Sequence, residues 1–139
     1  MKRVKMMAAA LLFAASALGS TPSVSKAQAT YYCQGLAATI VGTNGNNTLV
    51  GTDGNDVIVG LDGNDIIEGK GGNDTICGGN GQDEIYGDGG NDSLNGGDGH
   101  DVLRGGDGKD VLDCGAGDDD YNGGLGNDNI SNNCENKVL

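Results

Sequence analysis

A nine-residue period dominates this chain. From residue 42 to residue 131 the same pattern occurs ten times in succession, without insertion or deletion. The first position is glycine in every copy except the one that begins at Cys114, and the fourth is always glycine. The sixth is aspartate in nine copies, with Asn47 in the first, and the eighth is leucine, isoleucine or tyrosine. Self-similarity at a short fixed period predicts a repeat architecture.

Each repeat divides into a turn and a short strand. Positions one to six are rich in glycine, asparagine and aspartate, which tolerate left-handed backbone angles and favour turns. Positions seven to nine place one apolar side chain between two outward ones, which predicts a three-residue strand. Strands this short do not make an up-and-down hairpin sheet, but two repeats per coil can wind into a parallel roll. We therefore expect an all-β fold, a parallel β-roll (a β-helix or solenoid) of about five 18-residue coils, with no helix in the mature chain.

Residues 1–29 have the features of a Sec-type signal peptide. A basic start precedes the apolar run of residues 6–18, which is shorter than the ~20 residues that a membrane span needs. Ala27-Gln28-Ala29 fits a cleavage site, and cleavage near Gly19 is the alternative. We expect a secreted, extracellular protein without membrane insertion.

The remaining chain divides into a cap, the repeats and a second cap. Residues 30–41 are expected to form an N-terminal cap, either a degenerate capping turn or a loose strand, with Ile40 in the apolar column. Residues 42–131 are the ten repeats. Residues 132–139 are expected to form a C-terminal cap in which the same register continues, so that Leu139 falls in the apolar column.

The charge indicates a cationic partner. The formal net charge is −12, from 20 acidic and 8 basic residues, and four of the basic residues lie in the expected leader. The other basic residues are scattered, so there is no basic patch for nucleic acid or acidic lipid.

The energetics of the roll require a cation. Burying one isoleucine or leucine per repeat contributes about 1.5–3 kcal/mol, while ordering each of nine residues costs about 1–2 kcal/mol. Aspartates of repeats two apart stack at ~4.8 Å and repel by about 3.5 kcal/mol at an effective dielectric constant of 20. Calcium reverses this repulsion because it takes six to eight oxygen ligands. Magnesium is geometrically stricter, and zinc and copper favour histidine or thiolate ligands.

The expected calcium ligands are of three kinds, for up to about eight ions. The sixth-position carboxylates are Asp56, Asp65, Asp74, Asp83, Asp92, Asp101, Asp110, Asp119 and Asp128. The third-position side chains are Asn44, Asp53, Asp62, Asn80, Asp98 and Asp107. The turn carbonyls lie near Gly51, Gly60, Gly69, Gly78, Gly87, Gly96 and Gly105.

The repeats resemble a known family. The sequences GGDGHDVLR (residues 96–104) and GGDGKDVLD (105–113) match the nonapeptide G-G-x-G-x-D-x-U-x of the repeats-in-toxin (RTX) family, the hemolysin-type calcium-binding repeats. The resemblance implies a β-roll with calcium on the sixth-position aspartates and turn carbonyls. The chain is similar to the small secreted calcium-binding repeat proteins of bacteria. It lacks room for the catalytic or pore-forming domain of the large RTX toxins and proteases.

Four cysteines in a secreted chain indicate two disulfides, for which three pairings exist. Cys114 and Cys134 are 20 residues apart, about one 18-residue coil, which suits a disulfide. Cys77 and Cys114 are 37 residues apart, about two rungs, which is too far. We therefore expect Cys33–Cys77 and Cys114–Cys134. A zinc site is the rival, although no C-x-x-C spacing occurs.

The chain offers little for catalysis. His100 occupies a turn position without a nucleophile placed beside it. The run Asp118-Asp119-Asp120 places one ligand aspartate between a turn and a strand residue. We expect a non-enzymatic calcium-binding protein that folds on binding calcium. The alternatives are a calcium-dependent adhesin or surface-structural module, with a cell-surface or polysaccharide partner, and an enzyme.

Overall fold

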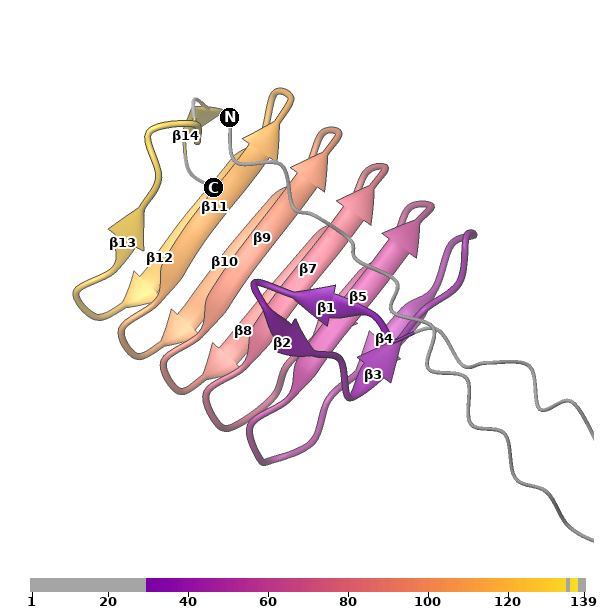
Figure 1. Cartoon of the computed structure of the whole chain (residues 1–139). Coiled ribbons are helices and arrows are strands. Elements are labelled where there is room, and N and C mark those ends of the chain that lie inside the picture. The colour runs from indigo at the N-terminus through magenta and orange to yellow at the C-terminus, as the bar shows by residue number, and fades with distance from the viewer. Residues whose placement is uncertain (1–29, 135, 138–139) are drawn as a thin grey trace, which may run out of the picture.

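The computed structural model describes residues 30–134 and 136–137, and this part of the chain is all-β, as expected. Twelve strands form two six-stranded parallel sheets that face each other (Figure 1). The odd sheet contains β3 (Ile40–Val41), β5 (Val57–Asp62), β7 (Thr75–Asn80), β9 (Ser93–Asp98), β11 (Val111–Ala116) and β13 (Asn129–Ile130). The even sheet contains β4 (Thr48–Val50), β6 (Ile66–Glu68), β8 (Glu84–Gly89), β10 (Val102–Asp107), β12 (Asp120–Leu125) and β14 (Asn136–Lys137).

The chain winds as a solenoid with an 18-residue coil. Consecutive strands from β3 to β14 alternate between the two sheets, so each strand pairs with the strand two further along the chain. Ile58 pairs with Ile76 in the odd sheet, and Ile85 pairs with Leu103 in the even sheet. The expected β-roll of about five coils is confirmed.

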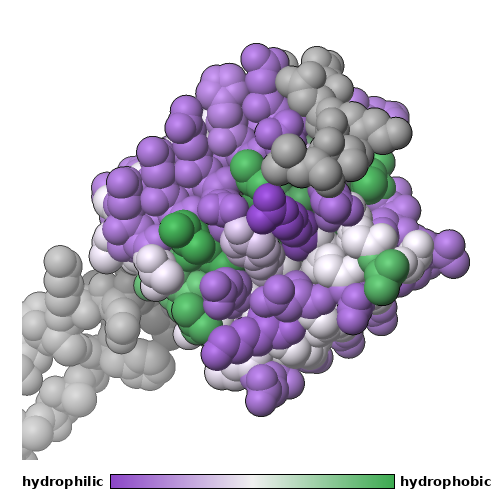
Figure 2. Space-filling view, turned by 180° about the vertical axis from the view of Figure 1, so that it is seen from behind, coloured by the Kyte–Doolittle hydropathy of each residue, from purple (hydrophilic) through white to green (hydrophobic). Residues whose placement is uncertain are grey.

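The eighth-position side chains form a thin core between the sheets. The seven central ones are fully buried, and Ile40, Leu49, Tyr121 and Ile130 close the two ends of the column as partly buried residues. The face that Figure 2 shows is largely hydrophilic, with separate small apolar patches. The buried members are Ile58, Ile67, Ile76, Ile85, Leu94, Leu103 and Leu112.

Most strands are longer than the three residues expected. β5 and β7 to β12 each run over six residues, from position seven of one repeat to position three of the next. The parallel pairing skips the first-position glycine and resumes at the second position, as at Leu61 opposite Gly79. The second-position residue has a positive φ there (86° at Leu61, 122° at Gly79), which bends the strand so that it rejoins the ladder. Only β4 and β6 keep the expected length.

The N-terminal segment forms a hairpin that the sequence did not predict. β1 (Tyr32–Cys33) and β2 (Leu36–Ala37) pair antiparallel. The two turn residues, Gln34 and Gly35, both have positive φ (51° and 88°), as a two-residue hairpin turn requires. β1 packs against β5 and β7 on the outer face of the odd sheet (Figure 1). Ile40 pairs with Ile58, which places it in the apolar column, as expected.

The hairpin creates a second small core outside the roll. Cys33 is bonded to Cys77, with their Cα atoms 5.8 Å apart. The buried side chains of Val59 and Leu61 pack around this disulfide under the hairpin. The hairpin therefore covers a group of apolar side chains on the outward face of the odd sheet.

The C-terminal end departs from the repeat register. β14 pairs with β12 so that Asn136 lies opposite Asp120 and Lys137 opposite Tyr121. The last coil is therefore two residues shorter than the others, and the expectation of a continuous register is wrong here. The Cα atoms of Cys114 and Cys134 are 5.1 Å apart, and both are buried at the end of the core. Both expected disulfide pairings are present. Leu139 and the signal peptide expected over residues 1–29 lie outside the described residues.

Among residues 30–134, 136 and 137 there is no helix long and apolar enough to cross a membrane.

The fourth-position glycines occupy the same place in the repeat, but the space around them differs from turn to turn. This difference predicts that alanine substitutions at two of them have unequal effects. A Cβ on Gly90 (φ 130°) would lie 1.7 Å from the carbonyl oxygen of Gly72. A Cβ on Gly54, which lacks a positive φ, would have only the hydroxyl oxygen of Thr52 nearby, at 3.7 Å. Gly90→Ala should therefore lower the free energy of unfolding by roughly 2 kcal/mol or more, and Gly54→Ala by less than about 1 kcal/mol. Urea unfolding in millimolar calcium measures both. Equal losses would contradict the difference between these turns.

Candidate calcium-binding turns

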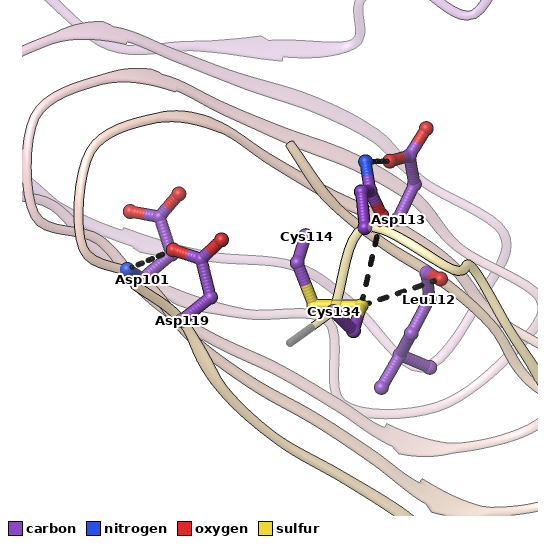
Figure 3. Close-up of a disulfide and its surroundings, with 7 residues drawn as sticks. Asp101, Leu112, Asp113, Cys114, Asp119 and Cys134 are labelled. Atoms are coloured by element: carbon purple, nitrogen blue, oxygen red, sulfur yellow. Dashed lines mark hydrogen bonds between the residues drawn. A yellow bond between two sulfur atoms is a disulfide. The ribbon is translucent and has the colours of Figure 1, made fainter. Parts of the chain in front are cut away.

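The turns stack along the two edges of the roll, and the sixth-position aspartates line both edges. Their side chains are buried from Asp56 to Asp119, each less than 9% exposed, while Asp128 at the C-terminal end is half-buried. The backbone N–H of each aspartate from Asp56 to Asp110 donates to Oδ1 of the aspartate one coil further along. This distance is 2.8 Å from Asp56 to Asp74 and 2.8 Å from Asp101 to Asp119 (Figure 3). One carboxylate oxygen of each stacked aspartate is thus held in place by the backbone.

The other carboxylate oxygen has no partner. In the described part of the chain, seven Oδ2 atoms are buried and accept no hydrogen bond. A buried carboxylate oxygen without a donor is costly, and a protein retains such a group where a cation completes it. These oxygens belong to Asp65, Asp74, Asp83, Asp92, Asp101, Asp110 and Asp119.

Six of the seven unpartnered oxygens point back over the first-position glycine of their own repeat; the exception is that of Asp119, whose repeat begins with Cys114. A Cβ on Gly78 would lie 2.4 Å from Asp83 Oδ2 and 2.6 Å from the carbonyl oxygen of Gly96 in the next coil. The same arrangement recurs around Gly60, Gly69, Gly87, Gly96 and Gly105. The first column is therefore glycine because a carboxylate oxygen and a carbonyl oxygen occupy the space that a side chain would take. Two hard oxygen atoms from adjacent coils are the donors that calcium prefers, so these residues fit the ion.

Burial disfavours the charged form of these carboxyl groups in the absence of a cation. It raises the pKa of Asp83 and of Asp92 to about 6 and that of Asp101 to about 7. The charges of the stacked neighbouring aspartates raise these pKa values further, and the backbone hydrogen bonds oppose the shift. Burial also raises the pKa of Asp65, Asp74, Asp110 and Asp119.

The third-position side chains do not join the sixth-position carboxylates. Asn44, Asp53, Asn80, Asp98 and Asp107 are exposed on the outside of the turns. Asp62 is half-buried, and its Oδ1 accepts a hydrogen bond of 2.7 Å from Nδ2 of Asn80. Over residues 30–134 and 136–137, no three acidic, histidine or cysteine side chains gather into a metal-binding group. An ion on these edges would therefore depend on backbone carbonyls together with the sixth-position oxygens.

The predicted turn carbonyls are largely where they were expected. The carbonyl oxygens of Gly60, Gly69, Gly78, Gly87, Gly96 and Gly105 each approach the first-position glycine one coil earlier. The carbonyl oxygens of Cys114 and Gly123, which the sequence analysis did not include, continue the series toward the C-terminal end. No such contact is present for the carbonyl of Gly51 among the described residues.

A second ladder, which the sequence analysis missed, runs along the fifth position. Oδ1 of Asn46 accepts from the backbone N–H of Asn64 at 2.8 Å, and Asn55, Asn64, Asn73 and Asn91 do the same toward the next coil. The recurrence of asparagine in this column was the available signal. His100 occupies the same column, and its Nδ1 lies 3.2 Å from the backbone nitrogen of Asp118. The histidine thus acts as one rung of a structural ladder.

The raised pKa values predict how the metal-free protein responds to pH. A carboxyl whose pKa is higher in the folded state than in the unfolded state binds more protons when folded, so folding stability rises as pH falls through the folded pKa. For Asp83, Asp92 and Asp101 this gain lies between about pH 7 and pH 4. Metal-free protein should therefore give a stronger β-sheet circular-dichroism signal at pH 5 than at pH 8. A signal that weakens over this interval would contradict the burial of these carboxyls.

Comparison with known proteins agrees with this geometry. A family model described as the RTX calcium-binding nonapeptide repeat matches four times, over residues 41–76, 68–103, 78–112 and 95–130. No curated protein and no solved structure matches the chain. The matched segments cover both edges of stacked aspartates and more than half of the sequence. The chain belongs to the family of RTX calcium-binding nonapeptide repeat proteins.

Proposed function

We propose that this chain is a secreted, non-enzymatic calcium-binding protein that folds when several calcium ions bind between its stacked turns. The observation that carries the proposal is the series of seven buried Oδ2 atoms without a hydrogen-bond donor. When calcium is bound, it neutralises these carboxylates and links adjacent coils through the turn carbonyls. The calcium-dependent coils and their ligand sets then form together, because the ligand set does not exist in the unfolded chain.

Among the described residues, no basic side chain offers the seven unpartnered carboxylates a substitute for the ion. Among the residues that the structure describes, the ion pair found is between Arg104 and Glu84, 3.4 Å apart on the outer face of the even sheet. Lys70 and Lys109 are exposed on the turns. The buried carboxylates therefore keep their repulsion unless a cation comes from solution.

The proposed extracellular location is supported by two features. Both disulfides require an oxidising compartment to persist, and residues 1–29 have the composition of a leader. Extracellular calcium modules bind in the range of about 10⁻⁴–10⁻³ M. Such an affinity would leave the chain unfolded at cytoplasmic calcium concentrations and folded outside the cell.

A calcium titration tests the proposal. The purified chain, with its leader removed and its disulfides intact, should change from a coil-like to a β-sheet circular-dichroism spectrum as calcium rises to millimolar concentration. A chelator should reverse the change, and magnesium at the same concentration should not produce it, because the carbonyl-rich site does not suit strict octahedral geometry. A spectrum that is insensitive to both calcium and chelator would contradict the proposal.

A pair of isosteric variants tests which column binds the ion. Asp92→Asn keeps Oδ1, which accepts from the backbone of Asp74, but replaces the unpartnered oxygen by an amide nitrogen. It should bind one calcium ion fewer than the wild type in equilibrium dialysis. Asp98→Asn, at an exposed third position, is the matched control and should keep the wild-type number. The reverse order would place the ions on the outside of the turns.

A further inference from the structure

The first two repeats carry threonine at the second position. Each of these threonines forms hydrogen bonds with the sixth-position side chain of its own repeat, whereas, within the described residues, the Oδ2 atoms of the later sixth-position aspartates from Asp65 to Asp119 have no donor. The backbone N–H of Thr52 donates to Asp56 Oδ2 at 2.6 Å, and its hydroxyl donates to the same oxygen at 2.9 Å. The backbone N–H of Thr43 donates to Oδ1 of Asn47 at 2.6 Å, and Nδ2 of Asn47 donates to the threonine hydroxyl at 3.0 Å. Asp56 Oδ2 therefore differs from the seven later oxygens in having two donors.

The backbone of these two turns also differs from that of the later ones. The second position has a positive φ even where it is not glycine, at Leu61 (86°), Lys70 (77°) and Asp88 (71°). Thr43 and Thr52 do not adopt this conformation. A β-branched residue is strongly disfavoured there, so threonine selects a turn in which its own N–H and hydroxyl face the sixth-position side chain.

The position of the Asp56 carboxylate also differs from that of the later aspartates. An ideal Cβ on Gly51 would lie 3.0 Å from Asp56 Oδ2, whereas the corresponding distance is 2.4–2.5 Å from Gly60 to Gly105. Asp56 Oδ2 thus turns away from the first-position glycine toward Thr52. The carbonyl oxygen of Gly69 stays 2.4 Å from the same Cβ position, so the carboxylate oxygen is displaced while the carbonyl is not.

The N-terminal end of the roll is also held by hydrogen bonds and a disulfide that involve no metal. The hydroxyl of Thr39 lies 3.4 Å from Asp56 Oδ1 and accepts from the backbone N–H of Val57 at 3.0 Å. Cys33–Cys77 ties the hairpin across β5 and β7. Side chain Oε1 of Gln34, at the tip of the hairpin, accepts from the hydroxyl of Ser93 at 2.8 Å.

We propose that Thr43 and Thr52 take the place of the calcium ion in the first two turns, so that ion binding begins at the turn that ends in Asp65. The second-position residue decides whether a turn takes an ion: threonine closes it, and a residue in the left-handed conformation leaves the carboxylate open. The N-terminal end then serves as a metal-independent start on which the calcium-dependent coils build. This inference rests on the proposed calcium-binding function.

The decisive experiment compares calcium stoichiometry in three full-length mature proteins, by equilibrium dialysis with metal analysis. Thr52→Gly removes the hydroxyl and permits the left-handed turn, so it should bind one calcium ion more than the wild type. Thr52→Ser, which keeps both donors, should bind the wild-type number. An unchanged number in a folded Thr52→Gly protein overturns the inference and leaves the proposed function standing. A wild type that binds no calcium overturns both.

Hydrogen exchange of the wild type in chelator, with disulfides intact, tests the inference without any substitution. The amides of Gly42 and Thr52, which donate to Val59 and Asp56, should exchange more slowly than those of Val102 and Val111, which donate to Asp83 and Asp92. Equal exchange at the two ends, or slower exchange at the C-terminal end, overturns the inference. This arm remains decisive if Thr52→Gly fails to fold.

Discussion

The structure depends on a negative charge that the protein buries and does not neutralise. Seven aspartates on the two edges of the roll each use one oxygen to hold the backbone of the preceding coil and leave the other without a donor. The core between the sheets is one side chain wide, so it has little free energy with which to offset this cost. In the proposed function, calcium turns the same carboxylates from a source of repulsion into a link between coils.

The two ends of the roll carry disulfides, and the N-terminal end also carries threonine donors. At the N-terminal end, threonine donors and the disulfide-tied hairpin satisfy Asp56 and cover the outer face of β5 and β7. At the C-terminal end, Cys114 replaces the first-position glycine and joins Cys134 over the last part of the core. Solenoids need ends that differ from their repeats. At the N-terminal end the threonine donors of Asp56 are part of this difference, whereas at the C-terminal end Asp119 Oδ2 still has no donor.

The features that were predicted correctly from the sequence are those that follow from its nine-residue period. The coil length, the apolar column from Ile58 to Leu112 and the stacking of the sixth-position aspartates follow from one nine-residue pattern, because every copy occupies the same environment. Both disulfides followed from the same coil length. The glycine at position one was predicted as a turn residue, but its reason, the carboxylate oxygen that folds over it, required the coordinates.

The features that escaped prediction are those that the period does not determine. The hairpin depends on the pairing of two non-repeated segments, and the short last coil lies beyond the ten repeats. Third-position side chains were expected beside the ion; Asp98 and Asp107 are exposed in the structure, and their part in calcium binding stays a prediction. The role of Thr52 was hidden because its partner, Asp56, looks like every other aspartate in its column.

The most direct measurement of the central claim is a crystal structure of the calcium-loaded protein with calcium located by its anomalous scattering. The account predicts anomalous peaks within bonding distance of the Oδ2 atoms of Asp65 to Asp119 and of the carbonyl oxygens of the adjacent turns. Peaks confined to the exposed third-position side chains, or buried carboxylates with no ion beside them, would contradict it.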